Sequence, residues 1–365
     1  MTNPPLYRRL DQAKKPLIIA GPCSVENQVQ FFATLKNLDL SKIDYIRGGI
    51  WKPRTRPGSF EGIGALAFEW VKEAKAEFGI KFATEVATAE HVEIALKNDA
   101  SMLWLGARTT VNPFTVQEIS EALKGVELPV FVKNPINPDL SLWKGALERL
   151  LKCNVKNLGA IHRGFQTFQQ NKYRNTPLWQ IPMELKGEFP DLPLLCDPSH
   201  IGGKRSLISE LSQRAMDLDY DGLMIETHID PDNALSDNAQ QLTPSDFNLL
   251  LNNLIFRSHT SKDQDFINQL EIIREQIDQA DREILEAIAT RLSLVEKIGE
   301  YKKENNVAIF QISRWKEILQ SRPEWAKAMN LDPEFIRELY RHIHQQSVRI
   351  QTSVFNTEQD KQPND

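Results

Sequence analysis

Eight short apolar runs, each followed by a stretch compatible with a helix, fill the first two-thirds of the chain. The apolar residues in these runs are continuous rather than alternating, which is typical of strands buried on both faces of a parallel sheet. Eight such repeats predict an α/β fold of the (β/α)8 TIM-barrel type, whose chemistry lies at the carboxyl ends of the strands. The runs are PLIIAGPCS (16–24), IDYIRGGIWKPRT (43–55), KFATE (81–85), MLWLGAR (102–108), PVFVKNP (129–135), LGAIHRGF (158–165), LPLLCDPSH (192–200) and DGLMIETH (221–228).

The composition favours a two-domain protein that binds small anions. A chain of 365 residues exceeds one average domain, and its 41% hydrophobic residues supply ample material for a core. The net charge of −5 gives no reason to expect nucleic acid or an anionic membrane as a partner. Lys and Arg are instead concentrated locally, which favours small-molecule substrates.

The expected location is the cytoplasm. The three cysteines, Cys23, Cys153 and Cys196, form no paired framework and fit a reducing compartment. The basic residues near the N-terminus are not followed by the apolar core of a secretory signal. No apolar run approaches the length needed to cross a bilayer.

A polar segment, RSHTSKDQD (257–265), divides the chain. We expect a barrel domain over 1–258, a linker over 259–265, a helical domain over 266–355 and a disordered tail over 356–365. Helical periodicity predicts one helix from about 265 to 304, a second from near Ser313, and a third from Asp332-Pro333-Glu334 to about 354. Three such helices cannot bury their apolar stripes alone, so we expect a homodimer or a higher homo-oligomer through this domain.

Four residues at the rim of the predicted barrel form a candidate metal site. Cys23, His200 and Glu226 end the first, seventh and eighth runs, and Asp237 follows in the next loop. The first and eighth strands are neighbours in a closed barrel, so the four side chains can converge. One thiolate, one imidazole and two carboxylates suit Mn, Fe, Co or Zn better than Ca or Mg. For each residue alone, a buried cysteine, a capping aspartate or a hydrogen-bonded core histidine is the simpler interpretation.

Cations also gather at the strand ends. Their mutual repulsion requires neutralising anions, and Arg suits bidentate binding of carboxylate or phosphate. A substrate with several negative charges is therefore expected, and on these grounds alone a sugar-phosphate or nucleotide enzyme with a barrel scaffold is possible. Solvated surface salt bridges are the alternative interpretation. The cations are Arg47, Lys52, Arg54, Arg108, Lys133 and Arg163.

Several motifs occur at or near the strand ends: GPCSVEN, KPRTRPGSF, GAR, HRGF, DPSHIGGKR and IETHIDPDNALSDNAQQL. Together they resemble the 3-deoxy-D-arabino-heptulosonate 7-phosphate (DAHP) synthase family, of the short-barrel type related to 3-deoxy-octulosonate-8-phosphate synthase. The resemblance covers roughly residues 14–255. It implies metal-dependent condensation of phosphoenolpyruvate with erythrose 4-phosphate, with Mn2+ as the expected ion and Fe, Co or Zn as alternatives. The metal would be held by Cys23, His200, Glu226 and Asp237 and would polarise the aldehyde oxygen.

The same resemblance implies roles for the remaining barrel residues. Lys52 would donate or accept the proton and His162 would help to position water. Arg54 and Thr55 would bind the phosphate of erythrose 4-phosphate. Phosphoenolpyruvate would be bound by Arg47, Lys52, Arg108, Lys133 and Arg163.

The long helix predicted in the second domain carries cations on an apolar stripe. Arg291, Val295, Ile298 and Lys302 are spaced i, i+4, i+7 and i+11, so the two cations share a face with apolar residues. A charge on such a face needs an anion or must reach water. Salt bridges within a helical bundle are the alternative interpretation.

Residues from about 266 to 354 resemble the all-helical chorismate mutase family. The matched positions are Arg274, Arg291, Lys302, Arg314, Ser347 and Gln351. The resemblance implies that arginines bind the two carboxylates of chorismate and that Lys302 and Gln351 hydrogen-bond the ether oxygen, with no cofactor. Arg274 would be contributed by the partner subunit.

Two positions depart from that family. Gln311 and Trp315 stand where relatives often carry acidic residues near the substrate hydroxyl. Gln311 can still hydrogen-bond the substrate, whereas the indole nitrogen of Trp315 cannot accept a hydrogen bond.

A non-catalytic helical module that dimerises the barrel or senses prephenate is the competing hypothesis. Fusion of the two domains also suggests that prephenate or chorismate bound at the helical domain lowers the activity of the barrel.

Overall fold

The computed structural model describes residues 16–52, 58, 60–168, 171–257, 261 and 263–356. The chain divides into two compact units, Met1–His259 and Thr260–Asp365. The predicted linker, 259–265, overlaps the start of a helix, because α11 begins at Gln264. Helix α13 extends to Asn356, and the rest of the predicted disordered tail lies outside the described residues.

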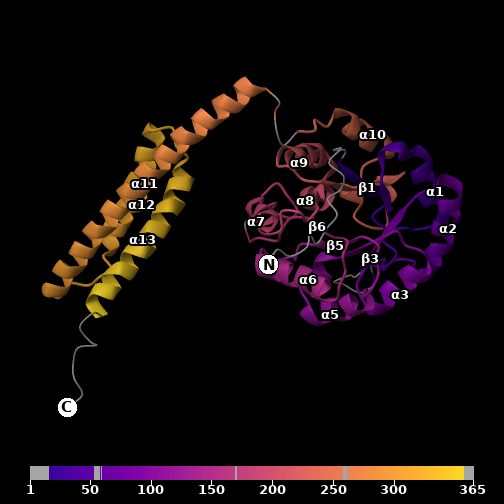
Figure 1. Cartoon of the computed structure of the whole chain (residues 1–365), viewed down its shortest axis with the longest axis horizontal. Helices are drawn as coiled ribbons and strands as arrows, with labels where there is room; N and C mark the ends of the chain where they lie inside the picture. Colours follow the sequence, from indigo (N-terminus) through magenta and orange to yellow (C-terminus); the bar gives the residue numbers. More distant parts are fainter. Residues whose placement is uncertain are drawn as a thin grey trace, which may run out of the picture. The chain divides into compact units, whose positions relative to one another are not determined.

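The first unit is a closed barrel of eight parallel strands in the order β1 to β8, so the predicted fold is confirmed. Figure 1 shows the strands at the centre and the helices around them. Each predicted apolar run contains one strand, except that β3 extends one residue beyond its run. The strands are β1 (Leu17–Gly21), β2 (Tyr45–Arg47), β3 (Phe82–Val86), β4 (Met102–Leu105), β5 (Val130–Lys133), β6 (Leu158–His162), β7 (Leu194–Cys196) and β8 (Gly222–Glu226).

Helices form the outer layer, and several are fixed by side-chain caps. The side chains of Asn27, Thr88, Asn112 and Asp139 accept hydrogen bonds from backbone N–H groups in the first turns of α1, α3, α5 and α6. The longer helices are α1 (Gln28–Asn37), α2 (Ala67–Phe78), α3 (Ala89–Lys97), α5 (Pro113–Ala122), α6 (Leu140–Lys152), α7 (Gln180–Glu188), α9 (Arg205–Asp217) and α10 (Pro244–Asn253); α4 (Ala107–Thr110) and α8 (Pro198–Gly202) are short.

The strands bury both of their faces. One set of alternate side chains fills the barrel axis, with Trp104, Phe131 and Ile161 among its members. The other set packs against the helices in a separate and larger core. Gly159 faces Phe131, whose ring occupies the space that a side chain on residue 159 would take. The inner set decides which strand-end residues reach the mouth of the barrel.

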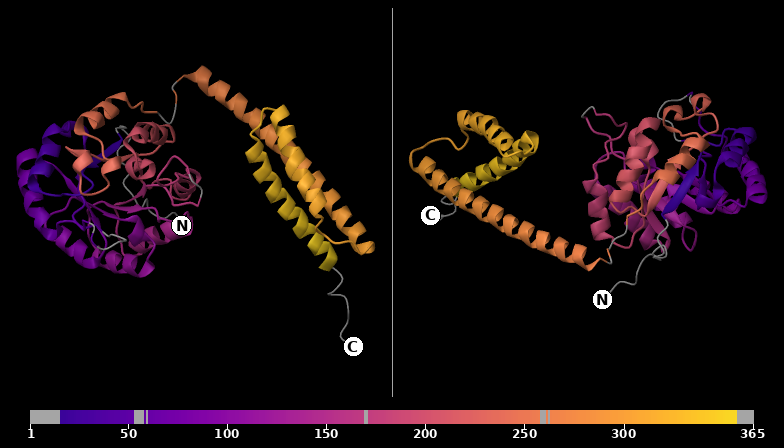
Figure 2. Two further views of the ribbon diagram at one scale, coloured as in Figure 1. Left: turned by 180° about the vertical axis from the view of Figure 1, so that it is seen from behind. Right: turned by 90° about the horizontal axis from the view of Figure 1, so that it is seen from above.

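The second unit consists of three helices, as predicted: α11 (Gln264–Glu304), α12 (Ile312–Ala328) and α13 (Pro333–Asn356). Helix α13 packs against both α11 and α12. It lies beside the C-terminal half of α11, and the N-terminal half of α11 extends beyond both other helices (Figure 2). Helix α11 has 41 residues and is about 60 Å long, and its N-terminal half has no partner helix among the described residues of the second unit (Figure 2).

Among the described residues, every helix is too short or too polar to span a membrane.

Candidate active sites

The alternation of the strands places charged side chains at the mouth of the barrel. On β5, Phe131 faces the barrel axis, so Lys133 two residues later faces it as well. On β8, Met224 faces the barrel axis, so Glu226 two residues later faces it as well. Arg47 likewise ends β2, and it is buried with only 1% of its surface exposed.

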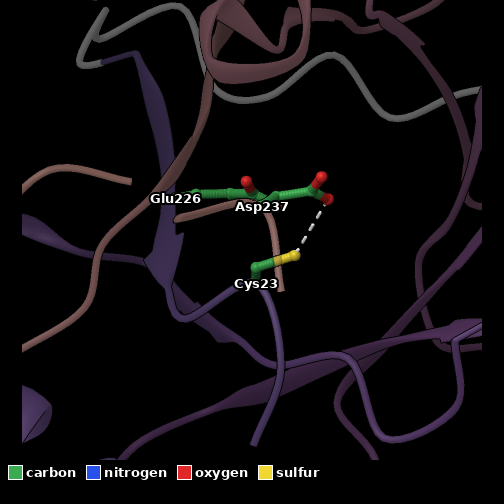
Figure 3. Close-up of side chains that lie close together, drawn as sticks. All are labelled: Cys23, Glu226 and Asp237. Carbon is green, nitrogen blue, oxygen red and sulfur yellow. Dashed lines mark hydrogen bonds between the residues drawn. The ribbon is translucent and has the colours of Figure 1, made fainter. Parts of the chain in front are cut away.

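Three of the four predicted metal ligands lie together. The ligand atoms of Cys23, Glu226 and Asp237 all lie within 4.8 Å of one another. Figure 3 shows the Cys23 thiol directed at the carboxylate of Asp237, with Sγ 3.4 Å from Oδ2. Cys23 and Glu226 are fully buried and Asp237 is partly buried. Asp237 lies in the loop after β8 and has left-handed backbone dihedrals (φ 44°, ψ 43°), which are uncommon for a residue other than glycine.

The fourth predicted ligand, His200, borders this group. Its Nε2 lies 3.8 Å from Oε1 of Glu226, and its Nδ1 lies 2.8 Å from Oδ2 of Asp197. Asp197 caps the short helix α8, since its Oδ1 accepts a hydrogen bond from the backbone N–H of His200. His200 is therefore oriented by Asp197 with Nε2 toward Glu226.

The electrostatics of the group fit a bound cation. Burial, together with the charge of Glu226, raises the pKa of the Cys23 thiol to about 12. Nζ of Lys52 lies 3.0 Å from Sγ and opposes that shift. Burial also opposes ionisation of Asp237, but His200 and Arg174 outweigh it and lower the pKa of that carboxyl. A divalent ion at this point would replace the thiol proton and neutralise the two carboxylates.

The ligand carboxylates are held from outside by polar partners. Nη2 of Arg47 lies 3.0 Å from Oε1 of Glu226, and Nε2 of Gln240 donates to Oε2 of Glu226 at 2.7 Å. Nη1 of Arg174 lies 2.9 Å from Oδ1 of Asp237. Such outer contacts fix the orientation of metal ligands.

Some N–H groups of the cations at the mouth have no partner among the described residues and could bind an anion. Nε and Nη1 of Arg47 are buried and have no hydrogen-bond partner among the described residues. Arg163 donates to Oδ1 of Asn175 at 2.8 Å, and burial lowers its pKa to about 10. Arg108 is exposed on α4, and its charge contributes to that shift, so it lies near Arg163. Lys133 forms an ion pair with Asp197, with Nζ 2.8 Å from Oδ2.

Two of the predicted residues, Arg54 and Thr55, lie outside the described residues. The expected binding of erythrose 4-phosphate by them therefore stays a prediction.

His162 does not reach the mouth of the barrel, contrary to its expected role in positioning water. Ile161 faces the barrel axis, so His162 faces the outer layer. Its Nε2 lies 2.6 Å from the carbonyl oxygen of Pro177, and its Nδ1 lies 3.0 Å from the hydroxyl of Tyr220. Burial lowers the pKa of His162 to about 3, so the ring is neutral and both nitrogens are already used.

Sequence reasoning missed Asp197, Arg174 and Asn175. Asp197 lies two residues after Leu195, which faces the barrel axis, and this spacing is a signal that could have identified it. Arg174 and Asn175 lie in the irregular segment between β6 and α7, where no periodicity applies. Asn175 holds both Arg163 and the backbone carbonyl of His200, the latter at 2.6 Å.

A second cationic cluster lies between α11 and α13. Nη1 of Arg291 donates to Oγ of Ser347 at 2.8 Å, and Nζ of Lys302 donates to the carbonyl oxygen of Ile309 at 2.5 Å. Ser347 and Gln351 are buried, and Oε1 of Gln351 has no partner among the described residues. Burial lowers the pKa of both Arg291 and Lys302. Among the described residues, no carboxylate forms an ion pair with Arg291 or Lys302, so the cluster holds positive charge.

The other predicted residues of this domain lie at its edge or away from it. Arg314 is exposed and pairs with Glu317, but its charge contributes to lowering the pKa of Arg291. Gln311 is exposed at the N-cap of α12. Arg274 is exposed, pairs with Glu271, and lies about 25 Å from Arg291 along α11. A single chain thus does not bring Arg274 to the cluster.

The chain is thus a (β/α)8 barrel with a cationic mouth, joined to a helical domain with a second cationic cluster. The chain belongs to the DAHP synthetase I family, because the model of that family matches residues 10–261. Residues 273–352 match the chorismate mutase type II family. A domain of the DAHP synthetase I family is therefore followed by a domain that matches the chorismate mutase type II family. The DAHP synthetase I family is generally metal-dependent, in agreement with the three gathered ligands.

The barrel is similar to phospho-2-dehydro-3-deoxyheptonate aldolase of Thermotoga maritima, at 32% identity over 225 residues, which is 62% of this chain and 64% of the relative. This chain thus spans less than two thirds of that relative. A crystal structure under the same protein name and organism has a TM-score of 0.58 and 29% identity, covering 65% of this chain and 67% of the other.

The helical domain is similar to two further proteins. Bifunctional chorismate mutase/prephenate dehydratase of Buchnera aphidicola is 40% identical over 87 residues, which is 24% of this chain and 23% of the relative. The 4-amino-4-deoxychorismate mutase of Streptomyces pristinaespiralis is 33% identical over 82 residues, which is 22% of this chain and 64% of the relative.

Proposed function

We propose that the barrel condenses phosphoenolpyruvate with erythrose 4-phosphate to DAHP in a metal-dependent reaction, and that the helical domain rearranges chorismate to prephenate without a metal. The observation that carries this proposal is the presence of two separate cationic clusters, of which, among the residues that the structure describes, only the barrel cluster borders a group of metal-ligand residues.

In the barrel, the cations would bind the carboxylate and phosphate of phosphoenolpyruvate. Arg47 and Arg163 offer N–H groups that face the mouth, Lys133 lies beside them, and Arg108 lies at the exposed edge. Cys23, Glu226 and Asp237, with His200 beside them, would hold a divalent ion, for which we propose Mn2+, with Fe, Co or Zn as alternatives. Such an ion supplies a Lewis acid that polarises the aldehyde oxygen of erythrose 4-phosphate.

Lys52 is assigned the proton transfer. C3 of phosphoenolpyruvate attacks the aldehyde carbon, water adds at C2, and inorganic phosphate leaves. Burial alone would lower the pKa of Lys52, but the neighbouring Cys23 and Glu226 raise it. The lysine is therefore charged at neutral pH and can donate its proton to the oxygen that becomes the new hydroxyl.

In the helical domain, positive charge and hydrogen-bond donors would hold chorismate in its reactive conformation. Arg291 and Arg314, with Arg274 of the partner subunit, would bind the two carboxylates, and Ser347 would support Arg291. Lys302 and the amide of Gln351 would donate to the ether oxygen as its bond to carbon breaks. Conformational restriction and preorganised charge account for the acceleration without a covalent intermediate.

A homodimer would complete this site. The N-terminal half of α11 exposes apolar side chains, with Ile273, Ile277 and Ile284 each about half exposed. Burial of this stripe against a second copy would stabilise the helix and bring Arg274 of the partner subunit to Arg291. The three free cysteines support a reducing cytoplasm as the location.

A paired assay of the full chain tests both activities. With phosphoenolpyruvate and erythrose 4-phosphate, EDTA should stop phosphate release, and added Mn2+ should restore it. Chorismate loss should be unaffected by EDTA. Cys23→Ala should abolish only the condensation, whereas Lys302→Ala should abolish only chorismate loss. Full condensation activity in Cys23→Ala would contradict the ligand assignment.

The alternative function of the helical domain is dimerisation or sensing without catalysis. Binding of prephenate without turnover of chorismate by the full chain would favour it. Feedback is a further part of the proposal: prephenate bound at the helical domain should lower the condensation rate. A chain truncated after residue 258 should lose that inhibition, and equal inhibition of both chains would refute the coupling.

A further inference from the structure

One residue beside the helical cluster has no role in the function proposed so far. His344 lies on the same face of α13 as Ser347 and Gln351, three and seven residues earlier. Its ring packs against that of Trp315 of α12 in a tilted arrangement, with ring centroids 4.0 Å apart and planes at 31°. The ring of Phe310 meets it edge-on at 5.9 Å. The imidazole is therefore held between two aromatic rings at the edge of the cluster.

The nitrogens of His344 are available to a ligand. Neither makes a hydrogen bond to any of the described residues, whereas the neighbouring Ser347 is engaged by Arg291. Burial, and then the positive charges of Arg291 and Lys302, lower the pKa of His344. The ring is thus neutral near pH 7 and offers one donor and one acceptor.

The chemistry of chorismate leaves one group for such a residue. Its two carboxylates need cations and its ether oxygen needs donors, which Arg291, Lys302 and Gln351 supply. Its ring hydroxyl is neutral and needs both an acceptor and a donor. The indole of Trp315 can only donate, and Gln311 is exposed at the start of α12.

We propose that His344, positioned by Trp315, binds the ring hydroxyl of chorismate and selects a hydroxyl over a protonated amine at that ring carbon. This inference rests on the proposed mutase function. A protonated amine beside Arg291 and Lys302 would need a carboxylate, and the charges that act on His344 are both positive. The helical domain should therefore act poorly on 4-amino-4-deoxychorismate.

Two substitutions separate the hydrogen bond from the ring stack. His344→Phe keeps an aromatic ring against Trp315 but removes both nitrogens, whereas His344→Gln keeps a donor and an acceptor. His342→Phe is the matched control, because His342 is exposed on the same helix. Circular dichroism of each full-length variant reports whether the helical domain is folded, and the condensation rate of the barrel reports whether the first unit is intact.

The measurement is the steady-state rate of loss of chorismate and of 4-amino-4-deoxychorismate. His344→Phe should lower kcat/KM for chorismate by about 10- to 100-fold, mainly through KM, because the hydroxyl takes no part in bond breaking. His344→Gln and His342→Phe should stay within about threefold of the wild type. Trp315→Glu supplies a carboxylate and should shift the ratio of the two kcat/KM values toward the amine by at least about tenfold.

The outcomes separate this inference from the proposed function. A wild-type chain that turns over neither substrate would overturn the mutase function itself. Wild-type turnover of chorismate with an unchanged KM in His344→Phe would overturn only the role of His344. Equal kcat/KM for the amine and the alcohol in the wild type would overturn the selectivity.

Discussion

The substitution His162→Gln tests whether the side chain of His162 on β6 faces the outer helices rather than the mouth of the barrel. Burial holds the pKa of His162 at about 3, against the opposing effect of the Pro177 carbonyl, compared with 6.5 for a free imidazole. Because the folded-state pKa is lowered, the contribution of His162 to the free energy of unfolding is fully present above pH 6.5 and is lost as the pH falls. At pH 5 the unfolded histidine is protonated and the folded one is not.

The expected loss can be worked from these two values. The interval from pH 6.5 to pH 5 is about 1.5 units, and each unit corresponds to about 1.4 kcal/mol. The free energy of unfolding should therefore fall by about 2 kcal/mol between pH 7 and pH 5 through this one residue. Any folded pKa below about 4 gives the same result, since the folded ring is then neutral at pH 5.

Urea unfolding at pH 7 and pH 5 measures the loss, with wild type and His162→Gln compared so that contributions from other groups cancel. Tryptophan fluorescence is a suitable signal because the ring of Trp179 lies 5.1 Å from that of His162. By NMR, the ring proton signal that disappears in His162→Gln should not titrate between pH 8 and pH 5 in the wild type. His162→Gln should retain condensation activity within a few-fold at pH 7.

Equal pH dependence of stability in the two proteins would refute the burial argument. A condensation rate that falls by 100-fold or more in a fully folded His162→Gln would instead restore the role of this histidine in positioning water.

Three further predictions concern the metal group, the barrel axis and the long helix. Arg174→Ala should weaken Mn2+ binding by about 10- to 100-fold in a chelator competition, because Asp237 loses its partner, whereas Lys172→Ala should not; equal affinities would contradict this role. Gly159→Ala places a Cβ 2.1 Å from the Phe131 ring and should lower the free energy of unfolding by about 1–3 kcal/mol, whereas Gly145→Ala in α6, with open space around it, should be neutral or stabilising. Ile277→Asp should shift sedimentation toward a monomer and reduce chorismate loss, whereas Gln279→Asp should do neither; an unchanged mass and rate in Ile277→Asp would exclude this stripe from the interface.

The sequence predicted the barrel well because its physical signal is strong. Strands buried on both faces are continuously apolar, and each of the eight runs could be separated from the helices by length and composition. The same continuity hides which residues face the axis. In LGAIHRGF, Ala160 and Ile161 are both apolar although one faces the helices and the other the axis, so the sequence did not reveal that His162 turns away and Arg163 turns in.

The candidate sites were predictable where a residue ends a regular element. Arg47, Lys133 and Glu226 each continue the inward-facing set of a strand, and Arg291 and Lys302 follow a helical stripe. Arg174 and Asn175 could not be placed in this way, because the irregular segment that carries them is positioned only by tertiary contacts.

The two sites differ in how they balance their charge. In the barrel, Glu226 pairs with Arg47, and Asp197 pairs with both Lys133 and His200, so the chain itself holds much of the site in place. In the helical domain, the charges of Arg322 and Arg314 act with burial to lower the pKa of Arg291. Positive charges gathered in this way repel one another, so we expect the geometry of that cluster to depend on a bound anion more than the geometry of the barrel site does. The feedback proposed above requires that an anionic product bind two states of the helical domain with different affinities, and a cluster that depends on a bound anion is the part of the molecule where we expect such a difference.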